Sequence, residues 1–297
     1  MKKCMLCLLA FLMLFSVSGC AKREEQQGQE STTHAGTTAP VQTASHRLGM
    51  GITASGDASK TGSAQIDITV AAVVLDADGK ITMCKLDSAQ NKVSVTDGAL
   101  PQDAMNMEFR TKYELGSDYK MATVSSIGKE WYEQADYFAQ RVVGLNAEQV
   151  KAIRTEKNAS GHMVATDDEI LTGCTIGVSD FISAIVKACE GNTVTFEGEA
   201  ASLTIQVHTT VDASSKNASD TTDGSANIYS DITVAALAKD DRELCTSKDS
   251  VRPKITFNRS GEITGTQLGT PESGNHTGTD TVSDTNADTK PGSTAEK

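Results

Sequence analysis

The segment that could carry chemistry spans residues 169–178 and reads EILTGCTIGV. Gly173 allows a close approach of the backbone, and Thr175 lies just ahead of a predicted helix over residues 179–188. The first N–H groups of a helix lack partners within the helix, and the helix dipole places positive charge at the same end. We therefore expect an anion such as a phosphate to bind near Thr175.

This segment resembles the FMN-binding domain of bacterial exported flavoproteins, whose motif is Asp-x-x-Ser/Thr-Gly-Ala-Thr followed by a helix. Thr172 matches the Ser/Thr, Gly173 the glycine and Thr175 the last threonine. Glu169 and Cys174 stand in place of the aspartate and the alanine. In that family a flavin transferase joins FMN through its phosphate to the last threonine. The resemblance thus implies FMN at Thr175, a flavin transferase that attaches it and a membrane redox partner.

The resemblance covers residues 48–190, about half of the chain. It includes the text DADGKITMCKLD at residues 76–87, which is similar to the family's strand, turn and strand. A second segment, SIGKEWYEQAD at residues 126–136, resembles repeat-bearing surface lipoproteins of clostridia-like bacteria.

A competing interpretation makes Thr175 a turn residue in a domain that keeps this fold without its ligand. Trp131 and Phe138 share one helical stripe, which favours core packing over stacking on a flavin. No nucleophile has a base at a recognisable spacing, so hydrolase chemistry has no support. The five histidines lack the pair spacing of zinc ligands, and the net charge of −12 opposes nucleic-acid binding. We therefore predict no catalytic residue, no metal and no nucleic acid.

The N-terminus has the pattern of a bacterial lipoprotein signal. Lys2 and Lys3 precede an apolar run over residues 5–17, and Val-Ser-Gly precedes Cys20. This order resembles a lipobox, in which the cysteine is lipidated and becomes the first residue of the mature protein. We predict a signal peptide over residues 1–19 and lipidation of Cys20, which would hold the protein on the extracytoplasmic face of the cell membrane. An ordinary cleaved signal or a membrane anchor is the alternative.

Composition divides the exported part into tethers and folded segments. Residues 20–45 are polar and poor in aliphatic side chains, which predicts a flexible stalk, and residues 269–297 form a polar tail that we expect to be disordered. Between them we predict a first α+β repeat over residues 46–192. A partial second repeat over residues 193–268 is mostly β and contains a loop at residues 212–224.

The repeat rests on a shared stretch of sequence. Residues 64–72 read AQIDITVAA, residues 226–236 read ANIYSDITVAA, and both contain DITVAA. A charged hairpin tip follows each copy, and the next strand then carries Cys84 or Cys245. Whether the two copies pack together stays open.

The elements of the first copy predict an α+β fold with an antiparallel sheet and two or three packed helices. Val, Ile and Thr flank the Asp-Gly turn at Gly79, which predicts a hairpin of strands over residues 66–75 and 80–86. The apolar spacing in residues 128–143 predicts an amphipathic helix that ends before Gly144.

Two further helices follow. Asn146 and Gln149 form a capping-box pattern that opens a short helix. The helix over residues 179–188 has Ser179 as its expected N-cap. Cys189 lies beyond its far end, about 20 Å from Cys174, which is too far for a disulfide. Other pairings among the four exported cysteines after Cys20 stay open, and we expect buried thiols more often than bonds.

Two hypotheses for function follow from these patterns. The first is a membrane-anchored lipoprotein that carries FMN at Thr175 and transfers electrons outside the cell. The second is a cofactor-free surface lipoprotein that acts as a binding or scaffold module, because the second copy ends before any match to the TGCT segment.

Overall fold

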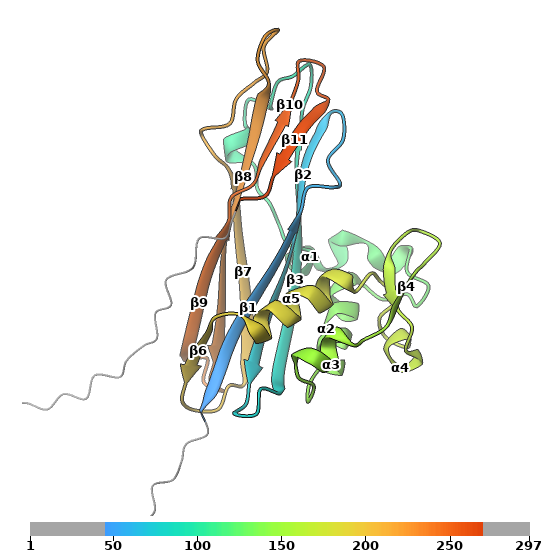
Figure 1. Cartoon of the computed structure of the whole chain (residues 1–297), viewed down its shortest axis with the longest axis vertical. Coiled ribbons are helices and arrows are strands. Elements are labelled where there is room, and N and C mark those ends of the chain that lie inside the picture. The colour runs from blue at the N-terminus through green and yellow to red at the C-terminus, as the bar shows by residue number, and fades with distance from the viewer. Residues whose placement is uncertain (1–44, 270–297) are drawn as a thin grey trace, which may run out of the picture. The chain divides into compact units, whose positions relative to one another are not determined.

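The computed structural model describes residues 45–269, so the predicted signal peptide, Cys20, the stalk up to residue 44 and the tail from residue 270 lie outside the described residues. The strands are β1 (His46–Ser55), β2 (Ser63–Leu75), β3 (Ile81–Ser94), β4 (Thr155–Lys157), β5 (Met163–Ala165), β6 (Thr193–Phe196), β7 (Ser202–Val211), β8 (Gly224–Leu237), β9 (Glu243–Val251), β10 (Lys254–Phe257) and β11 (Ile263–Gln267) (Figure 1). The helices are α1 (Lys112–Leu115), α2 (Trp131–Arg141), α3 (Ala147–Lys151), α4 (Asp168–Leu171) and α5 (Ser179–Glu190), with short 3-10 turns at Ala104–Asn106, Gly116–Tyr119 and Met121–Thr123.

Two antiparallel sheets form the body of the described region, which confirms the predicted α+β class. The first sheet has the strand order β3-β2-β1-β6, and the second has the order β11-β10-β8-β7 with β9 also paired to β8. The β4–β5 hairpin stands apart from both. The strand β6 follows residue 192 but pairs with β1, so the expected boundary between the two repeats does not separate the two sheets.

The sheets pack face to face around one hydrophobic core, so the two copies do pack together. Ile66, Ile68 and Val70 of β2 meet Ile232 and Val234 of β8 in this core. Equivalent residues of the shared DITVAA stretch therefore face one another across the two sheets. The alternation of a strand places these residues on one face of each sheet.

The helices cover the other face of the first sheet. Val73 and Leu75 of β2 face a second core cluster with Trp131, Phe138 and Phe181 from α2 and α5. The aromatic pairs Trp131 to Phe181 and Phe138 to Phe181 each have ring centroids 5.7 Å apart. From Val70 to Leu75, where β2 is buried on both faces, its sequence is a continuous apolar run.

Helix α5 lies directly against the glycines of β1. A Cβ atom at Gly49 would lie 1.9 Å from the carbonyl oxygen of Ala188, and one at Gly51 would lie 1.9 Å from that of Ala184. No side chain fits between these backbones, so the two glycines set the distance between the helix and the sheet.

The local predictions are confirmed with small shifts. The hairpin turns at Gly79 as predicted, with strands longer than expected. Asn146 and Gln149 form the capping box that opens α3, with both hydrogen bonds at 3.0 Å. Helix α2 is shorter than the predicted 128–143. The predicted N-cap of α5 is wrong: Ser179 is the first helical residue, and Val178 is the N-cap without a side-chain hydrogen bond.

The cysteines of the two copies do not occupy equivalent positions. Cys84 lies opposite Val73 in the register of β2 with β3, on the face covered by helices, whereas Cys245 lies in the core between the sheets. A shift of one residue in a strand moves a side chain to the other face. All four cysteines of the described region are free thiols.

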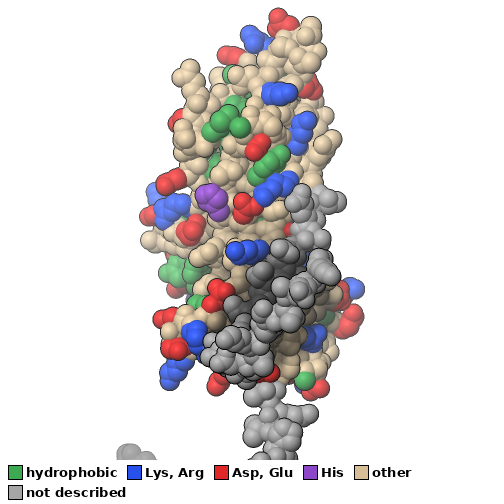
Figure 2. All heavy atoms as spheres, turned by 90° about the vertical axis from the view of Figure 1, so that its left-hand side faces the viewer, with side chains coloured by type: hydrophobic (Ala, Val, Ile, Leu, Met, Phe, Trp, Pro, Cys, Tyr) green, Lys and Arg blue, Asp and Glu red, His purple; other side chains and the backbone are tan. Residues whose placement is uncertain are grey.

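The second sheet has no helical layer, and its outer face is largely polar. Gln206, His208 and Thr210 of β7 are exposed on it. Figure 2 shows charged side chains of both signs dispersed over this side of the molecule, with few hydrophobic side chains between them. No helix in the described region is long and apolar enough to cross a membrane.

Candidate functional site

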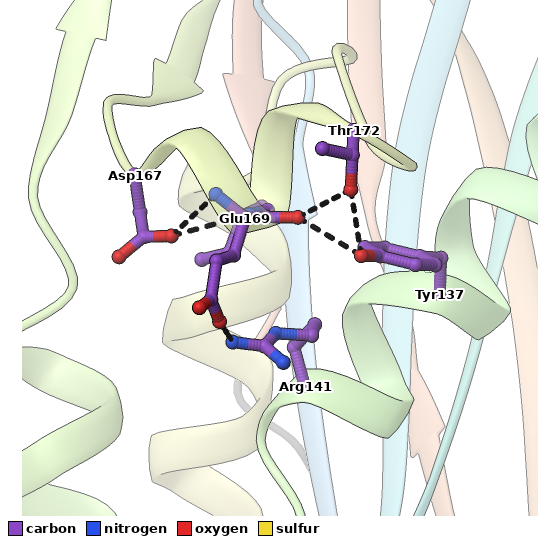
Figure 3. A network of polar contacts seen from close by, with 6 residues as sticks. Tyr137, Arg141, Asp167, Glu169 and Thr172 are labelled. Atoms are coloured by element: carbon purple, nitrogen blue, oxygen red, sulfur yellow. Dashed lines mark hydrogen bonds and ion pairs between the residues drawn. The ribbon is translucent and has the colours of Figure 1, made fainter. Parts of the chain in front are cut away.

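The predicted flavin segment begins at the short helix α4. The Asp167 carboxylate accepts the N–H groups of Glu169 and Ile170 at 2.9 and 3.2 Å and so caps this helix. The exposed carboxylate of Glu169 turns toward α2, where it pairs with the guanidinium of Arg141 (Figure 3). Because the Glu169 carboxylate and Arg141 are both solvent-exposed, this ion pair contributes little to stability.

Thr172 belongs to the same surface network. Its hydroxyl lies 2.7 Å from the carbonyl oxygen of Glu169 and 2.8 Å from the Tyr137 hydroxyl, and the Tyr137 hydroxyl donates to the same carbonyl at 2.9 Å (Figure 3). The ring of Tyr137 also covers Gly173, where a Cβ atom would lie 2.3 Å from the ring. Because Gly173 has no side chain, the ring of Tyr137 can lie against it. The resemblance predicts a flavin beside this glycine, but a side chain of the protein itself lies there.

Cys174 and Thr175 lie deeper. Cys174 is fully buried, and this burial raises the pKa of its thiol to about 12. The backbone N–H of Thr175 donates to the side-chain carbonyl oxygen of Gln134 at 3.0 Å, and the Thr175 hydroxyl donates to the same oxygen at 3.3 Å. Thr175 is therefore tied to α2 by both of its donors.

Gln134 is itself held in place. It has no exposed surface, and its side-chain amide donates to the Ser125 hydroxyl at 3.1 Å and to the Lys129 carbonyl at 3.0 Å. The oxygen that accepts from Thr175 is therefore fixed by the other end of the same amide. The position of Gln134 on a helical stripe could have marked it as buried, but its partner Thr175, 41 residues away, could not be found from the sequence.

A polar cluster lies beside the first turn of α5. The ammonium of Lys112 stands 5.1 Å from the ring centroid of Tyr119 and 5.4 Å from that of Trp131. Burial lowers the pKa of Lys112, and the nearby Asp67 and Asp180 oppose this shift. The carboxylates of Asp67 and Asp180 thus offset part of the charge of Lys112.

A flavin phosphate at Thr175 needs N–H donors directed at it and positive charge that is not already compensated. Both Thr175 donors go to Gln134, and Asp180 places a carboxylate in the first turn of α5. Of the other predicted residues, Glu169 pairs with Arg141 and Thr172 bonds to Tyr137. The residues in this arrangement do not fit a flavin phosphate, and FMN at Thr175 stays a prediction.

A hollow that the sequence motifs do not indicate lies at the edge of the second sheet. It measures about 680 Å³ and lies between β7 and the segment that follows β3. Its lining consists of residues 105–110 with Glu114 on one side, and of residues 207–210 of β7 on the other. The run SLTIQVHTTV could have indicated an unprotected strand edge here, because it has the pattern of a strand and contains no charged residue or proline.

Comparison of this chain with protein-family models, curated proteins and solved structures gives no match.

Proposed function

We propose that this chain is a lipoprotein of the extracytoplasmic face of the cell membrane, anchored through Cys20, whose two-sheet body works as a binding module without a cofactor. One observation carries this proposal. The threonine expected to hold a flavin gives both of its donors to Gln134. The hollow beside β7, which is open to solvent, supports the binding role.

The anchor is supported by the sequence that precedes the described residues. The apolar run and the Val-Ser-Gly-Cys order would place Cys20 at the membrane, and 25 residues would separate it from His46, where β1 begins. An extended chain of that length spans up to about 85 Å. The folded body could therefore contact molecules well beyond the lipid surface.

The absence of a helical layer on the second sheet supports a binding role. The first copy has one face of its sheet covered by α2 and α5, whereas the outer face of β7 and β8 carries exposed polar side chains such as His208 and Asp231. These side chains are exposed and could therefore contact a partner.

The absorption spectrum of the native lipoprotein tests this proposal. Purified from a host that contains the flavin transferase, the protein should lack the visible absorbance of oxidised flavin, and its band in a denaturing gel should not fluoresce. Fluorescence that disappears in Thr175→Ala would overturn the proposal and establish the electron carrier instead. That alternative requires Gln134 to release Thr175, so Gln134→Ala should then increase flavin attachment.

A further inference from the structure

The outer edge of β7 is open. The strand pairs with β8 from Ser202 to Val211 without a break in register, and no strand of the described region pairs with its other side. In an antiparallel strand, every second residue directs its N–H and C=O groups away from the neighbouring strand. One side of β7 therefore presents a row of backbone donors and acceptors without partners in the sheet.

The edge of β7 is shielded by residues 105–110 alone, which make no backbone hydrogen bond to it, whereas the other outer strands of the two sheets are protected in further ways. Thr111 bridges to Ala89 and covers part of the edge of β3, β6 has four residues, and β9 and β11 carry charged side chains or register shifts. Proteins use such features to prevent the addition of further strands. The sequence of β7 has no Lys, Arg, Asp, Glu or Pro, and its register has no bulge.

A groove runs along this edge. Residues 105–110 form its second wall: Met107 and Phe109 pack against the core between the sheets, whereas Glu108 and Arg110 are exposed. The bridge from Thr111 ties this wall to β3, and no backbone hydrogen bond of the described region joins it to β7. The groove thus has one wall in which exposed polar side chains alternate with half-buried apolar ones, and one wall of open strand edge.

We propose that this groove binds an extended peptide segment of a partner protein, which adds a strand to β7 and places a basic side chain at Glu108. The proposal rests on the binding function proposed above and names its partner. Four residues of β7 line the groove, so the bound segment would be about 13 Å long within it. Strand addition supplies affinity through the backbone, and the pockets for alternate side chains supply specificity.

The charges around the groove favour a basic segment. Arg110 is engaged by Asp118 at 3.4 Å and by the Glu114 carbonyl, and the Glu114 carboxylate accepts the Thr111 N–H at 2.8 Å. Glu108 is exposed and has no ion-pair partner within residues 45–269. The net charge of −12 on the whole chain attracts a basic partner over longer distances.

The same features disfavour a second copy of this chain. The wall formed by residues 105–110 stands beside the edge of β7, so another folded sheet could not align with it, whereas a single extended segment could enter. The β7 strand of a second copy has no basic residue to meet Glu108. Two copies would also repel each other through their negative charge.

A synthetic peptide tests the proposal on the full chain in detergent. The probe is a fluorescein-labelled peptide of alternating valine and threonine that carries one lysine, and fluorescence polarisation measures its binding. Two further peptides carry N-methyl groups on the valine amides or on the threonine amides. Because only one set of amides faces β7, one N-methylated peptide should lose roughly tenfold in affinity while the other binds like the parent. Equal affinities of the two would overturn strand addition.

A charge exchange tests the position of the peptide. Glu108→Lys should lower the affinity for the lysine peptide about fivefold and raise the affinity for a peptide with glutamate in place of lysine by a similar factor. Glu156→Lys, at an exposed carboxylate on β4 away from the groove, is the matched control and should leave the affinities for both peptides unchanged. If both variants behave alike, the groove is not the site.

Other occupants would be recognised by their own results. Dimerisation that an excess of the probe peptide reverses would assign the groove to a second copy, and tighter probe binding after deletion of residues 270–297 would assign it to the chain's own tail. Either result overturns the proposal of a partner peptide. A flavin spectrum would instead overturn the proposed function, so the two failures remain distinguishable.

Discussion

The carboxyl group of Asp87 should make the stability of the folded body depend on pH. Asp87 lies on β3 and is 3% exposed. Burial raises its pKa from 3.8 to about 6, although hydrogen bonds from the Thr111 hydroxyl and from the N–H groups of Ser88 and Tyr113 oppose this shift. A pKa that is higher by about two in the folded protein means that folding favours the neutral carboxyl over the carboxylate by about 3 kcal/mol.

The sign of this effect follows from proton binding. Between pH 3.8 and about 6 the folded protein holds the Asp87 proton more tightly than the unfolded chain does, so unfolding releases a proton. The neutral Asp87 carboxyl therefore stabilises the folded protein fully below pH 3.8, its pKa in the unfolded chain, and this contribution is lost as the pH rises through about 6. Asp87→Asn removes this dependence, because an amide stays neutral at every pH in this range. Relative to the wild type, Asp87→Asn should thus gain about 3 kcal/mol between pH values near 4 and near 7.

Urea unfolding at a series of pH values measures this difference. The cost of the amide at its hydrogen bonds is independent of pH and appears as a constant offset, so only the change with pH carries the prediction. Thr111→Val removes a hydrogen bond that lowers the pKa of Asp87, so the loss of stability in that variant should move to higher pH. Parallel curves for the wild type and Asp87→Asn across the whole range would refute the reasoning.

Three further predictions concern the packing, the threonine and the anchor. Gly51→Ala places a methyl group 1.9 Å from a carbonyl oxygen of α5 and should destabilise the protein by about 3 kcal/mol in urea unfolding; a loss below about 1 kcal/mol would mean that α5 shifts easily. Gln134→Ala leaves the N–H of Thr175 without its acceptor and should cost about 1–3 kcal/mol in the same assay, more than Gln140→Ala at an exposed site of the same helix. Cys20→Ser should abolish incorporation of labelled palmitate and release the protein from the membrane fraction; unchanged labelling would contradict the lipobox.

Local patterns predicted the local structure. The Asp-Gly turn at Gly79 and the capping box of Asn146 depend on residues within four positions of each other, and both form as the sequence indicates. The stripe of Trp131 and Phe138 also predicts its buried face, because helical spacing alone decides which side chains share that face.

The candidate site could not be predicted in this way, because its geometry depends on distant partners. The segment around Thr175 has the composition of an anion site, but Gln134 takes both donors of the threonine and Tyr137 covers Gly173. Neither residue belongs to the motif. A short motif fixes which groups are present, whereas the elements that pack against it decide whether those groups face a ligand.

The strand that precedes DITVAA differs between the two copies at one position that suits the covered face of the first sheet and the uncovered face of the second. Gly51 lies opposite Ala71 in β1 and β2, and Thr204 lies opposite Ala235, the equivalent alanine, in β7 and β8. The glycine leaves room for the backbone of α5, whereas a threonine side chain occupies the same space and remains partly exposed. A helix could not approach the second sheet at this position as closely as α5 approaches the first. The outer face of the first sheet therefore packs against helices. The second sheet keeps an uncovered outer face and the open edge of β7, and both can contact another molecule.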